Sequence, residues 1–418
     1  MTIRVSHFAH ADAGSGASAN ALRLHRGLAE LGVRSRLLVA QKLSDVPDVV
    51  QLRQASFVGR RWRELEPWLE ARVLDRLAPG REQPLSSGLL GYDPVPCVEA
   101  DGSDLVQLHW LGCASLRLDR LPALSRPIVW RLADMWAFCG VEHLCEDPRP
   151  FLVDASGPDQ SAPAIDRWLE RRKRRIYGRM KNLTVVCPSH WLAELAGRSR
   201  LLQGRPIEVI PTGCDTTLFR PLDRRTCRDL LGLPQDRPLV LAGATNLAAH
   251  HKGLDLFVTA INGLQGAQRD ATAVLFGPRA SDVTRALALP VIDQGFISDP
   301  LRMALLYSAC DVFVAPSRIE NLSNAVPEAM ACGTPCVAFP IGGMPDMIAH
   351  REAGYLARPF EAEDLATGIG WALENGTDHA LRDRCRAVIE ARFSQAAQAE
   401  AFLALYRRIL DARPDRGP

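Results

Sequence analysis

Short runs of β-branched and other apolar residues alternate with amphipathic helical segments along the whole chain. This alternation predicts a doubly wound α/β protein with mostly parallel strands. In the first half of the chain, the predicted strands are Ile3–Phe8, Ser35–Ala40, Leu105–His109, Ile128–Leu132, Leu183–Pro188 and Ile207–Ile210. In the second half, they are Leu239–Ala242, Ala273–Gly277, Val291–Asp293, Val312–Ala315 and Cys336–Phe339.

The chain of 418 residues exceeds the length of one ordinary domain. The composition changes after Pro211-Thr212-Gly213, and Phe219–Asp223 has the character of an interdomain linker. We therefore expect two Rossmann-like domains, residues 1–215 and 222–390, that face each other across a cleft. A final helix is expected within residues 391–412.

The overall composition is that of a globular protein, with 47% hydrophobic and 23% charged residues. A formal net charge of +2 gives no strong global attraction to nucleic acid. No apolar run approaches the roughly 18 residues that would predict a membrane-spanning helix. The N-terminus is predicted to form a strand rather than a signal peptide, so the expected location is the cytoplasm.

The eleven cysteines are scattered, and in a cytoplasmic chain we expect free thiols rather than disulfides. One cluster raises the alternative of a metal site, because Cys139 and Cys145 lie close to Glu142, His143 and Asp147. Their spacing does not match a standard zinc pattern, so no metal ligand is assigned.

Two glutamates, Glu320 and Glu328, lie eight positions apart across the predicted junction of a loop and a helix. Pro327 suits the first turn of that helix, and Gly333 suits its C-terminal cap. Backbone N–H groups of residues 320–326, together with the helix N-terminus, can face an anion. The arrangement favours a phosphorylated ligand rich in hydroxyls, with amides for the phosphates and carboxylates for the hydroxyls.

The run from Glu320 to Pro335 resembles the donor-site motif of the retaining glycosyltransferases of family four, also called glycosyltransferase group 1. The similarity continues through Val337–Asp346 and Ala353–Leu356, and in weaker form over nearly the whole chain. The resemblance implies a GT-B fold with an acceptor-side first domain, a donor-binding second domain and a last helix, Gln395–Leu410, that crosses back to the first domain.

The same resemblance implies a cell-surface polysaccharide type of enzyme. Such an enzyme transfers a sugar from a nucleotide-diphosphate sugar to a hydroxyl of a saccharide or lipid-linked saccharide, in bacterial surface polysaccharide or glycolipid biosynthesis. The implied reaction retains anomeric configuration and uses neither a metal nor another cofactor.

Lys252 is the predicted cation for the leaving diphosphate. It precedes a predicted helix, where a cation is mildly unfavourable, and this placement favours a functional role over that of a surface lysine. The resemblance implies a phosphate-binding lysine at this position and an arginine several residues earlier, which this chain lacks. That region is occupied by Thr245, Asn246, His250 and His251. We assign Thr245 and Asn246 to the donor site.

The resemblance implies that Glu328 binds the ribose hydroxyls and that Glu320 lies near the transferred sugar as a catalytic residue. The alternative for both glutamates is favourable electrostatics at a helix start. The implied diphosphate ligands are the backbone amides of Asn321, Leu322 and Ser323. Phe296 and Ile297, which follow a predicted strand, are assigned to the same donor site.

Small residues follow the first predicted strand, where Gly14, Ser15 and Gly16 precede a helix. Glycines allow close approach of the backbone to a phosphate or sugar. The pattern is not a complete dinucleotide fingerprint, and glycine for a tight first turn is the alternative. The resemblance implies that this loop faces the donor diphosphate.

Two further strands are expected to end at the acceptor side, at His109 and at Asp134-Met135-Trp136. We predict that His109, Asp134 and Trp136 are exposed there, and we assign catalytic roles to His109 and Asp134. A satisfied core histidine is the alternative for His109. The resemblance implies a histidine just before the Asp-Met-Trp run, where this chain has Ala133.

Two helical segments have unusual surfaces. Arg171-Arg172-Lys173-Arg174-Arg175, followed by Arg179 and Lys181, predicts either a solvated charged face or peripheral contact with anionic lipid headgroups at the inner face of the membrane. Residues 57–77 predict a peripheral amphipathic helix with apolar side chains at helical spacing. These side chains are Trp62, Leu65, Trp68, Leu69, Val73 and Leu77.

Two other functions compete with glycosyl transfer. A nucleotide-sugar epimerase shares the two-domain architecture but needs no acceptor, and the long motif from Glu320 to Pro345 argues against it. A catalytically silent sugar-binding partner is suggested by Ala133 and by the missing arginine.

Overall fold

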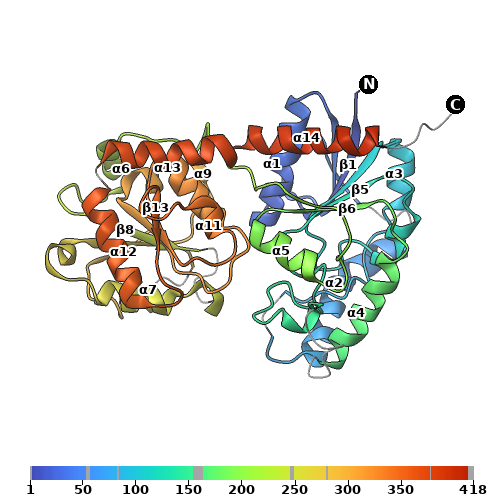
Figure 1. Cartoon of the computed structure of the whole chain (residues 1–418), viewed down its shortest axis with the longest axis horizontal. Coiled ribbons are helices and arrows are strands. Elements are labelled where there is room, and N and C mark those ends of the chain that lie inside the picture. The colour runs from blue at the N-terminus through green and yellow to red at the C-terminus, as the bar shows by residue number, and fades with distance from the viewer. Residues whose placement is uncertain are drawn as a thin grey trace. The chain divides into compact units, whose positions relative to one another are not determined.

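A computed structural model describes residues 2–52, 57–81, 84–153, 163–244, 249–278, 281–376 and 378–412 of the chain. Contacts divide the chain into two compact units (Figure 1). Unit 1 comprises Met1–Pro211 together with Gln398–Pro418, and unit 2 comprises Thr212–Ala397. Each unit is built on its own parallel sheet.

The sheet of unit 1 has, within the described residues, seven parallel strands in the order β3-β2-β1-β4-β5-β6-β7. The strands are β1 (Arg4–Ala11), β2 (Arg34–Gln41), β3 (Val49–Gln51), β4 (Leu105–Leu108), β5 (Ile128–Arg131), β6 (Leu183–Cys187) and β7 (Ile207–Val209). The strand order reverses between β1 and β4, as in a doubly wound fold, and ligands bind at the carboxyl edge of such a reversal.

The α-helices of unit 1 are α1 (Gly16–Glu30), α2 (Phe57–Leu77), α3 (Val95–Asp101), α4 (Ala164–Tyr177), α5 (His190–Arg198) and α14 (Gln395–Asp411), which enters this unit at Gln398. Two 3₁₀ helices span Leu118–Ala123 and Arg149–Phe151. The helix α1 begins where it does because the Ser15 hydroxyl accepts the Ser18 N–H at 3.2 Å, which caps the first turn.

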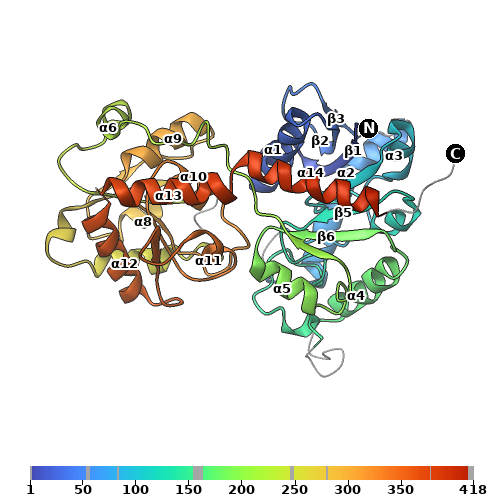
Figure 2. The same cartoon turned by 45° about the horizontal axis from the view of Figure 1, so that its top comes forward.

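The last helix, α14, belongs to the core of unit 1 (Figures 1 and 2). Its Phe402 and Tyr406 are fully buried among apolar residues of β1, β4, β5 and β6. The Tyr406 hydroxyl donates to Gln107 Oε1 at 2.8 Å, which satisfies two polar groups inside that core. The helix predicted near the C-terminus is confirmed.

The sheet of unit 2 has six parallel strands among the described residues, in the order β10-β9-β8-β11-β12-β13. They are β8 (Leu239–Gly243), β9 (Thr272–Phe276), β10 (Val291–Asp293), β11 (Val312–Ala315), β12 (Cys336–Ala338) and β13 (Gly354–Leu356).

Helices cover both faces of the second sheet. Phe257 and Ile369 lie in one core cluster, and Tyr307, Met330 and Ile389 lie in the other. The α-helices are α6 (Arg224–Leu231), α7 (Leu254–Asn262), α8 (Ser281–Thr284), α9 (Pro300–Ala309), α10 (Ala325–Ala331), α11 (Met344–Met347), α12 (Ala362–Asn375) and α13 (His379–Arg392). Two 3₁₀ helices span His250–Lys252 and Gly266–Asp270.

The segment Phe219–Asp223 is not the linker that its composition suggested. Phe219 is fully buried in the core of unit 2, with its ring centroid 6.2 Å from that of Tyr307. The chain enters unit 2 at Thr212, so this segment is part of the unit and packs against it. The predicted class, two doubly wound α/β domains, is confirmed.

Candidate functional site

Lys252 and Glu320 form an ion pair at the carboxyl edge of the second sheet. Lys252 Nζ lies 2.6 Å from Glu320 Oε2, although the two residues are 68 positions apart in the sequence. Lys252 follows β8 and Glu320 follows β11, and these strands are neighbours in the sheet. The two side chains are only 24% and 18% exposed, so their charges interact more strongly than they would in open water.

Arg318 fastens the two loops that hold this ion pair. Its backbone N–H donates to the His251 carbonyl at 2.7 Å, next to Lys252. Its guanidinium binds Asp255 through two hydrogen bonds of 2.6 and 2.5 Å. The hydrogen bonds from Arg318 also lower the pKa of Asp255. Arg318, which lies two positions before Glu320, therefore fixes the turn from which Lys252 projects.

Two glycines allow the same loops to approach other backbone closely. A Cβ added at Gly253 would lie 2.0 Å from the Pro316 carbonyl oxygen, and one at Gly342 would lie 1.6 Å from the Glu320 carbonyl oxygen. Both glycines have positive φ, at 66° and 50°. Next to Gly342, the Gly343 N–H donates to the Asn321 carbonyl at 2.7 Å. The Gly342-Gly343 pair therefore positions the loop of Glu320.

The helix that holds Glu328 begins earlier than predicted. It is α10, with Asn324 as its N-cap and Pro327 and Glu328 inside its first turns. The prediction of a loop as far as residue 326 was wrong because Ala325 and Val326 already adopt helical geometry. In the part of the chain that the structure describes, the amides of Leu322 and Ser323 donate to no acceptor. They remain available to an anion.

The other residues predicted to contact the donor lie in different environments. Phe296 is 63% exposed after β10, and Ile297 packs against the core of unit 2. Among the described residues, no hydrogen bond or ion pair joins Phe296 or Ile297 to Lys252 or Glu320, and both assignments stay predictions. Thr245 and Asn246 lie outside the described residues.

The loop after β1 in unit 1 is held by a buried aspartate. Asp12 accepts the Leu43 N–H at 2.7 Å and the Ser44 N–H at 3.1 Å, together with the Ser44 hydroxyl. Burial alone would raise the pKa of Asp12, but these hydrogen bonds outweigh burial and lower it. Gly14 has a φ of 85°, which supplies the tight turn. The Ser15 hydroxyl caps α1 and is therefore engaged within the protein. The groups of this loop that could bind a ligand are the backbone groups of Gly14 and Gly16.

The predicted exposure of His109 was wrong. The residue is 1% exposed, and its Nε2 lies 3.0 Å from Nδ1 of the fully buried His7. Burial, with repulsion from neighbouring positive charge, lowers the pKa of both histidines well below 6.5, so both rings are neutral near pH 7. The residues before His109 are buried on both faces of a central strand, which favours the core interpretation over the assigned catalytic one.

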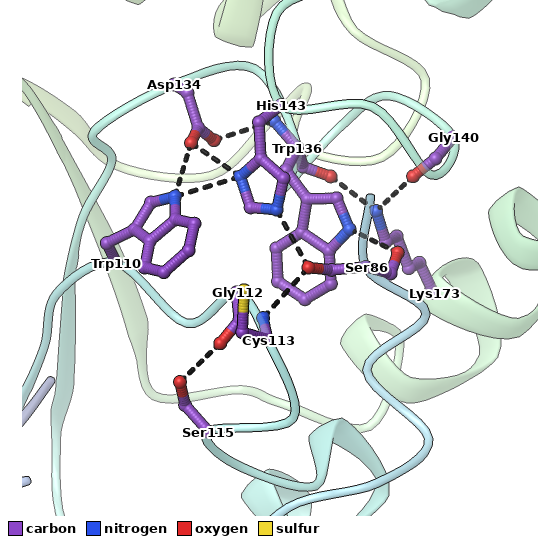
Figure 3. A network of polar contacts seen from close by, with 10 residues as sticks. All are labelled: Ser86, Trp110, Gly112, Cys113, Ser115, Asp134, Trp136, Gly140, His143 and Lys173. Atoms are coloured by element: carbon purple, nitrogen blue, oxygen red, sulfur yellow. Dashed lines mark hydrogen bonds and ion pairs between the residues drawn. The ribbon is translucent and has the colours of Figure 1, made fainter. Parts of the chain in front are cut away.

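Asp134 is held by three N–H donors (Figure 3). Its Oδ2 accepts from Trp110 Nε1 at 2.7 Å and from His143 Nδ1 at 2.6 Å, and its Oδ1 accepts the Trp136 N–H at 3.0 Å. The side chain is 14% exposed, so part of the carboxylate remains open to a ligand. Trp136, predicted to be exposed, is 2% exposed because its ring packs into the core of the unit.

His143 contacts Asp134, and Ser86 contacts the other ring nitrogen of His143, as Figure 3 shows. The Ser86 hydroxyl accepts the Cys113 N–H at 3.0 Å, which leaves its own proton for His143 Nε2 at 2.9 Å. In the tautomer with its proton on Nδ1, His143 donates that proton to Asp134, and Trp110 Nε1 lies 2.9 Å from the same nitrogen. The order Asp-His-Ser resembles a hydrolytic triad, but Ser86 is 1% exposed, so the chain of hydrogen bonds orients Asp134.

Lys173 is not part of an exposed basic face. It is fully buried and donates to the carbonyls of Trp136, Cys139 and Gly140, with its ammonium 4.3 Å from the Trp136 ring centroid. Burial lowers its pKa to about 7. Lys173 therefore fixes the segment 136–140 that follows Asp134.

The cluster around Cys139 and Cys145 is engaged in other contacts. Glu142 pairs with Arg81 at 3.3 Å, and the Cys139 carbonyl accepts a hydrogen bond from Lys173 Nζ at 3.0 Å. Within the described ranges, no group of three or more histidine, cysteine or acidic side chains is arranged to hold a metal ion. None of the described helices combines the length and the apolar character needed to cross a bilayer.

Known proteins resemble both the second unit alone and nearly the whole chain. Residues 237–375 match the family model described as glycosyl transferases group 1. The 2-deoxystreptamine glucosyltransferase of Streptomyces kanamyceticus is 27% identical over 409 residues, which cover 93% of this chain and 98% of that protein. The D-inositol 3-phosphate glycosyltransferase 2 of Catenulispora acidiphila is 26% identical over 430 residues, which cover 96% and 91%.

The solved structure of Anabaena Alr3699/HepE in complex with UDP-glucose aligns with a TM-score of 0.65 at 18% identity, and covers 97% of this chain and 100% of that chain. This similarity confirms the predicted GT-B fold. The predicted enzyme class, a glycosyltransferase, is confirmed.

Proposed function

We propose that the chain is a retaining, metal-independent glycosyltransferase. It moves a hexosyl group from a nucleotide-diphosphate sugar to a hydroxyl of a saccharide or lipid-linked saccharide, in bacterial surface polysaccharide or glycolipid synthesis at the cytoplasmic face of the membrane. The observation that supports this proposal most directly is the ion pair between Lys252 and Glu320, because it brings a cation and a carboxylate to one point at the carboxyl edge of a parallel sheet.

In this proposal, the two charges of the pair have separate tasks. Negative charge builds on the leaving diphosphate, and the Lys252 ammonium stabilises it together with the amides of Leu322 and Ser323. Positive charge builds on the sugar in its oxocarbenium-like transition state, and the Glu320 carboxylate stabilises that charge. Without a donor, the two side chains neutralise each other, so neither charge is left alone in a half-buried site.

The proposed chemistry is balanced within the two substrates. The acceptor hydroxyl attacks the anomeric carbon from the face that the diphosphate leaves, so a new glycosidic bond replaces the bond to phosphate. A phosphate oxygen of the leaving group takes the hydroxyl proton. No side chain has to act as a general base, which suits Glu320 and Lys252 as electrostatic groups.

On the acceptor side, Asp134 is the group best prepared to bind a hydroxyl. Three N–H donors hold its carboxylate in one orientation, and an oriented acceptor loses little freedom when a ligand hydroxyl donates to it. The names of two full-length relatives specify 2-deoxystreptamine and D-inositol 3-phosphate as substrates. A free cyclitol is therefore a second candidate acceptor.

A panel of nucleotide sugars tests the donor part of the proposal. A sugar nucleotide present at a hundredfold excess over its dissociation constant should stabilise the folded chain by about 3 kcal/mol, which a thermal shift detects. Transfer is then measured with the stabilising donor and with saccharide, lipid-linked and cyclitol acceptors. Added chelator should leave the rate unchanged.

The substitution Glu320→Ala should abolish transfer and leave the chain folded. Donor binding without transfer to any acceptor would favour the silent sugar-binding protein, and release of an epimerised sugar from the donor alone would favour the epimerase. The proposal fails if no nucleotide sugar stabilises the chain, or if Glu320→Ala transfers sugar at the rate of the unaltered enzyme.

A further inference from the structure

Helix α2 turns large apolar side chains toward solvent. Their exposed fractions are 50% for Trp62, 52% for Leu65, 58% for Trp68, 50% for Val73 and 53% for Leu77. At about 100° per residue, Trp62, Leu65 and Trp68 lie within about one third of the helix circumference, and Val73 and Leu77 lie at the edge of this face, beside the buried Glu66. We call the five positions together the outer stripe of α2. Single exposed apolar residues are ordinary, but two exposed tryptophans and a leucine on one face of a helix mark an interaction surface.

The most buried charged residues of α2 are acidic. Glu66 and Glu70 are 3% and 5% exposed and bind inside the unit, Glu66 to Arg63 and Glu70 to Ser87. The arginines next to the outer stripe, Arg61, Arg72 and Arg76, are exposed, and the Arg72 guanidinium lies 5.4 Å from the Trp68 ring centroid.

The exposed acidic residues of this helix lie to one flank of the stripe. They are Glu64, which pairs with Arg61 at 3.2 Å, and Asp75. The outer stripe itself therefore presents apolar and cationic groups in alternation. This combination is typical of helices that lie in the interface of a membrane with anionic lipids.

A second helix of unit 1, α4, also exposes a tryptophan and arginines. Leu74 of α2 and Leu169 of α4 share one core cluster, so the two helices are packed neighbours. Trp168 of α4 is 44% exposed, and Arg171 and Arg175 are exposed with it. The formal net charge of the chain is only +2, so the attraction of these arginines to anions is local.

The inner side of α2 lines a cavity. It has a volume of about 360 Å³ and lies at the carboxyl ends of β1, β2 and β3. Its lining includes His10, Gln41, Gln51, Arg63 and Tyr92. A helix that lies on a membrane with its outer stripe would bring this polar cavity close to the headgroups.

We propose that the outer stripe of α2 docks unit 1 on an anionic bilayer. Trp62, Leu65 and Trp68 enter the interface, and Arg72 and Arg76 bind lipid phosphates. The inference rests on the membrane partner of the proposed function and assigns it to a surface. A bilayer fits better than a protein partner, because cations interleaved with tryptophans match the phosphate and acyl layers of one lipid surface.

Vesicle cosedimentation of the full chain tests the docking surface. The chain should sediment with vesicles that contain phosphatidylglycerol and much less with phosphatidylcholine alone, and added salt should weaken binding. The double variant Trp62→Ser/Trp68→Ser should lower the partition coefficient on the order of tenfold or more. The charge variant Arg72→Glu/Arg76→Glu should lose the preference for the anionic lipid.

Matched controls lie on unit 2. Leu230 and Leu301 are 67% and 53% exposed, so Leu230→Ser/Leu301→Ser removes comparable exposed apolar groups and should bind vesicles normally. The Trp62→Ser/Trp68→Ser variant should keep the thermal shift with the nucleotide sugar and its transfer to a lipid-free acceptor. Failure of docking is thereby distinguished from failure of the proposed enzyme activity.

Three results would overturn the inference. The unaltered chain could fail to bind anionic vesicles, or the tryptophan variant could bind them as well as the control does. A dimer in sedimentation velocity that dissociates in the same variant would assign the stripe to a second copy of the chain.

Discussion

At the scale of single residues, the ion pair between Lys252 and Glu320 predicts that loss of the lysine impairs donor binding and that loss of the carboxylate impairs transfer. Lys252→Met should remove the thermal shift by the nucleotide sugar, because the diphosphate loses its cation. Glu320→Gln should retain most of that shift but lower the transfer rate by a factor of roughly 10² or more, because its role is in the transition state.

A double-mutant cycle measures the pair itself. Each single variant leaves one half-buried charge without its partner, so the free energies of unfolding of the two variants should be non-additive by about 1 kcal/mol or more. Additive values would show that the two side chains do not interact in solution. A Glu320→Gln enzyme with unaltered transfer would remove Glu320 from the mechanism.

Lys173 gives a prediction about pH at the same scale. Its pKa is lowered by burial to about 7 in the folded chain, whereas an unfolded lysine has its ordinary value of 10.5. Between these two values the unfolded chain binds more protons, so the free energy of unfolding should rise with pH by up to about 1.4 kcal/mol per unit. Below about pH 7 the contribution of Lys173 should be constant.

Urea denaturation of the unaltered chain and of the Lys173→Met variant across that pH range isolates the contribution of Lys173 to the free energy of unfolding. All other groups titrate alike in the two proteins. The difference in free energy between the two should widen in favour of the unaltered chain as the pH rises. A constant difference would mean that the three carbonyl acceptors keep the ammonium charged throughout.

At the scale of elements, the contact between strands β1 and β4 through His7 and His109 should make unit 1 sensitive to acid. Both pKa values are lowered well below 6.5 by burial, so below about pH 6.5 the unfolded chain binds protons that the folded chain does not. The free energy of unfolding should therefore fall as the pH drops, by up to about 1.4 kcal/mol per unit for each histidine.

The variant His109→Asn provides the comparison for this acid sensitivity. It should show a shallower fall in the free energy of unfolding between about pH 6.5 and pH 5, since one of the two buried imidazoles is gone. Equal slopes for the variant and the unaltered chain would contradict the assignment.

The loop that holds Glu320 gives a prediction about backbone geometry. Gly342→Ala would place a methyl carbon 1.6 Å from the Glu320 carbonyl oxygen, so the loop must move and transfer should fall by roughly tenfold or more. Gly266 is a matched control, because it also has positive φ, at 55°, but an added Cβ there meets nothing within 4 Å. Gly266→Ala should lose about 1 kcal/mol of stability and keep its transfer rate.

The elements themselves were largely predictable from the sequence. Most strands were identified to within one to three residues, because continuous apolar runs in parallel sheets leave a clear signal. The strands Val49–Gln51 and Gly354–Leu356 were missed, although three other strands of three residues, β7, β10 and β12, were predicted. The pairing of Lys252 with Glu320 also required the structure, because sequence distance carries no information about which strands are neighbours in a sheet.

Two wrong predictions, the exposure of Lys173 and that of His109, could have been avoided from the sequence. Lys173 lies four residues after Leu169 and three before Ile176, both buried, so helical spacing already placed it on the inner face of α4. His109 ends a strand that is buried on both faces, where a polar residue is expected to be buried as well. The network of Asp134, His143 and Ser86 had no such signal, since its members come from separate segments of the chain.

At the scale of the whole molecule, the chain completes its first unit with its last helix. Phe402 and Tyr406 of α14 are buried against the first sheet, although unit 2 lies between the two parts in the sequence. Phe402→Ala should therefore destabilise unit 1 by about 3 to 5 kcal/mol through lost burial and a residual cavity. The residues of unit 2 contribute nothing to that core cluster, so its own stability should not change.

Chemical denaturation of Phe402→Ala should accordingly separate into two transitions, of which only the later one responds to the nucleotide sugar. Arg407→Ala, an exposed position on the same helix, should denature like the unaltered chain. If the nucleotide sugar raises both transitions equally, or if Phe402→Ala shifts a single transition, the two units unfold as one cooperative body. Under the proposed function, binding of the nucleotide sugar in unit 2 would then be coupled energetically to the sheet of unit 1.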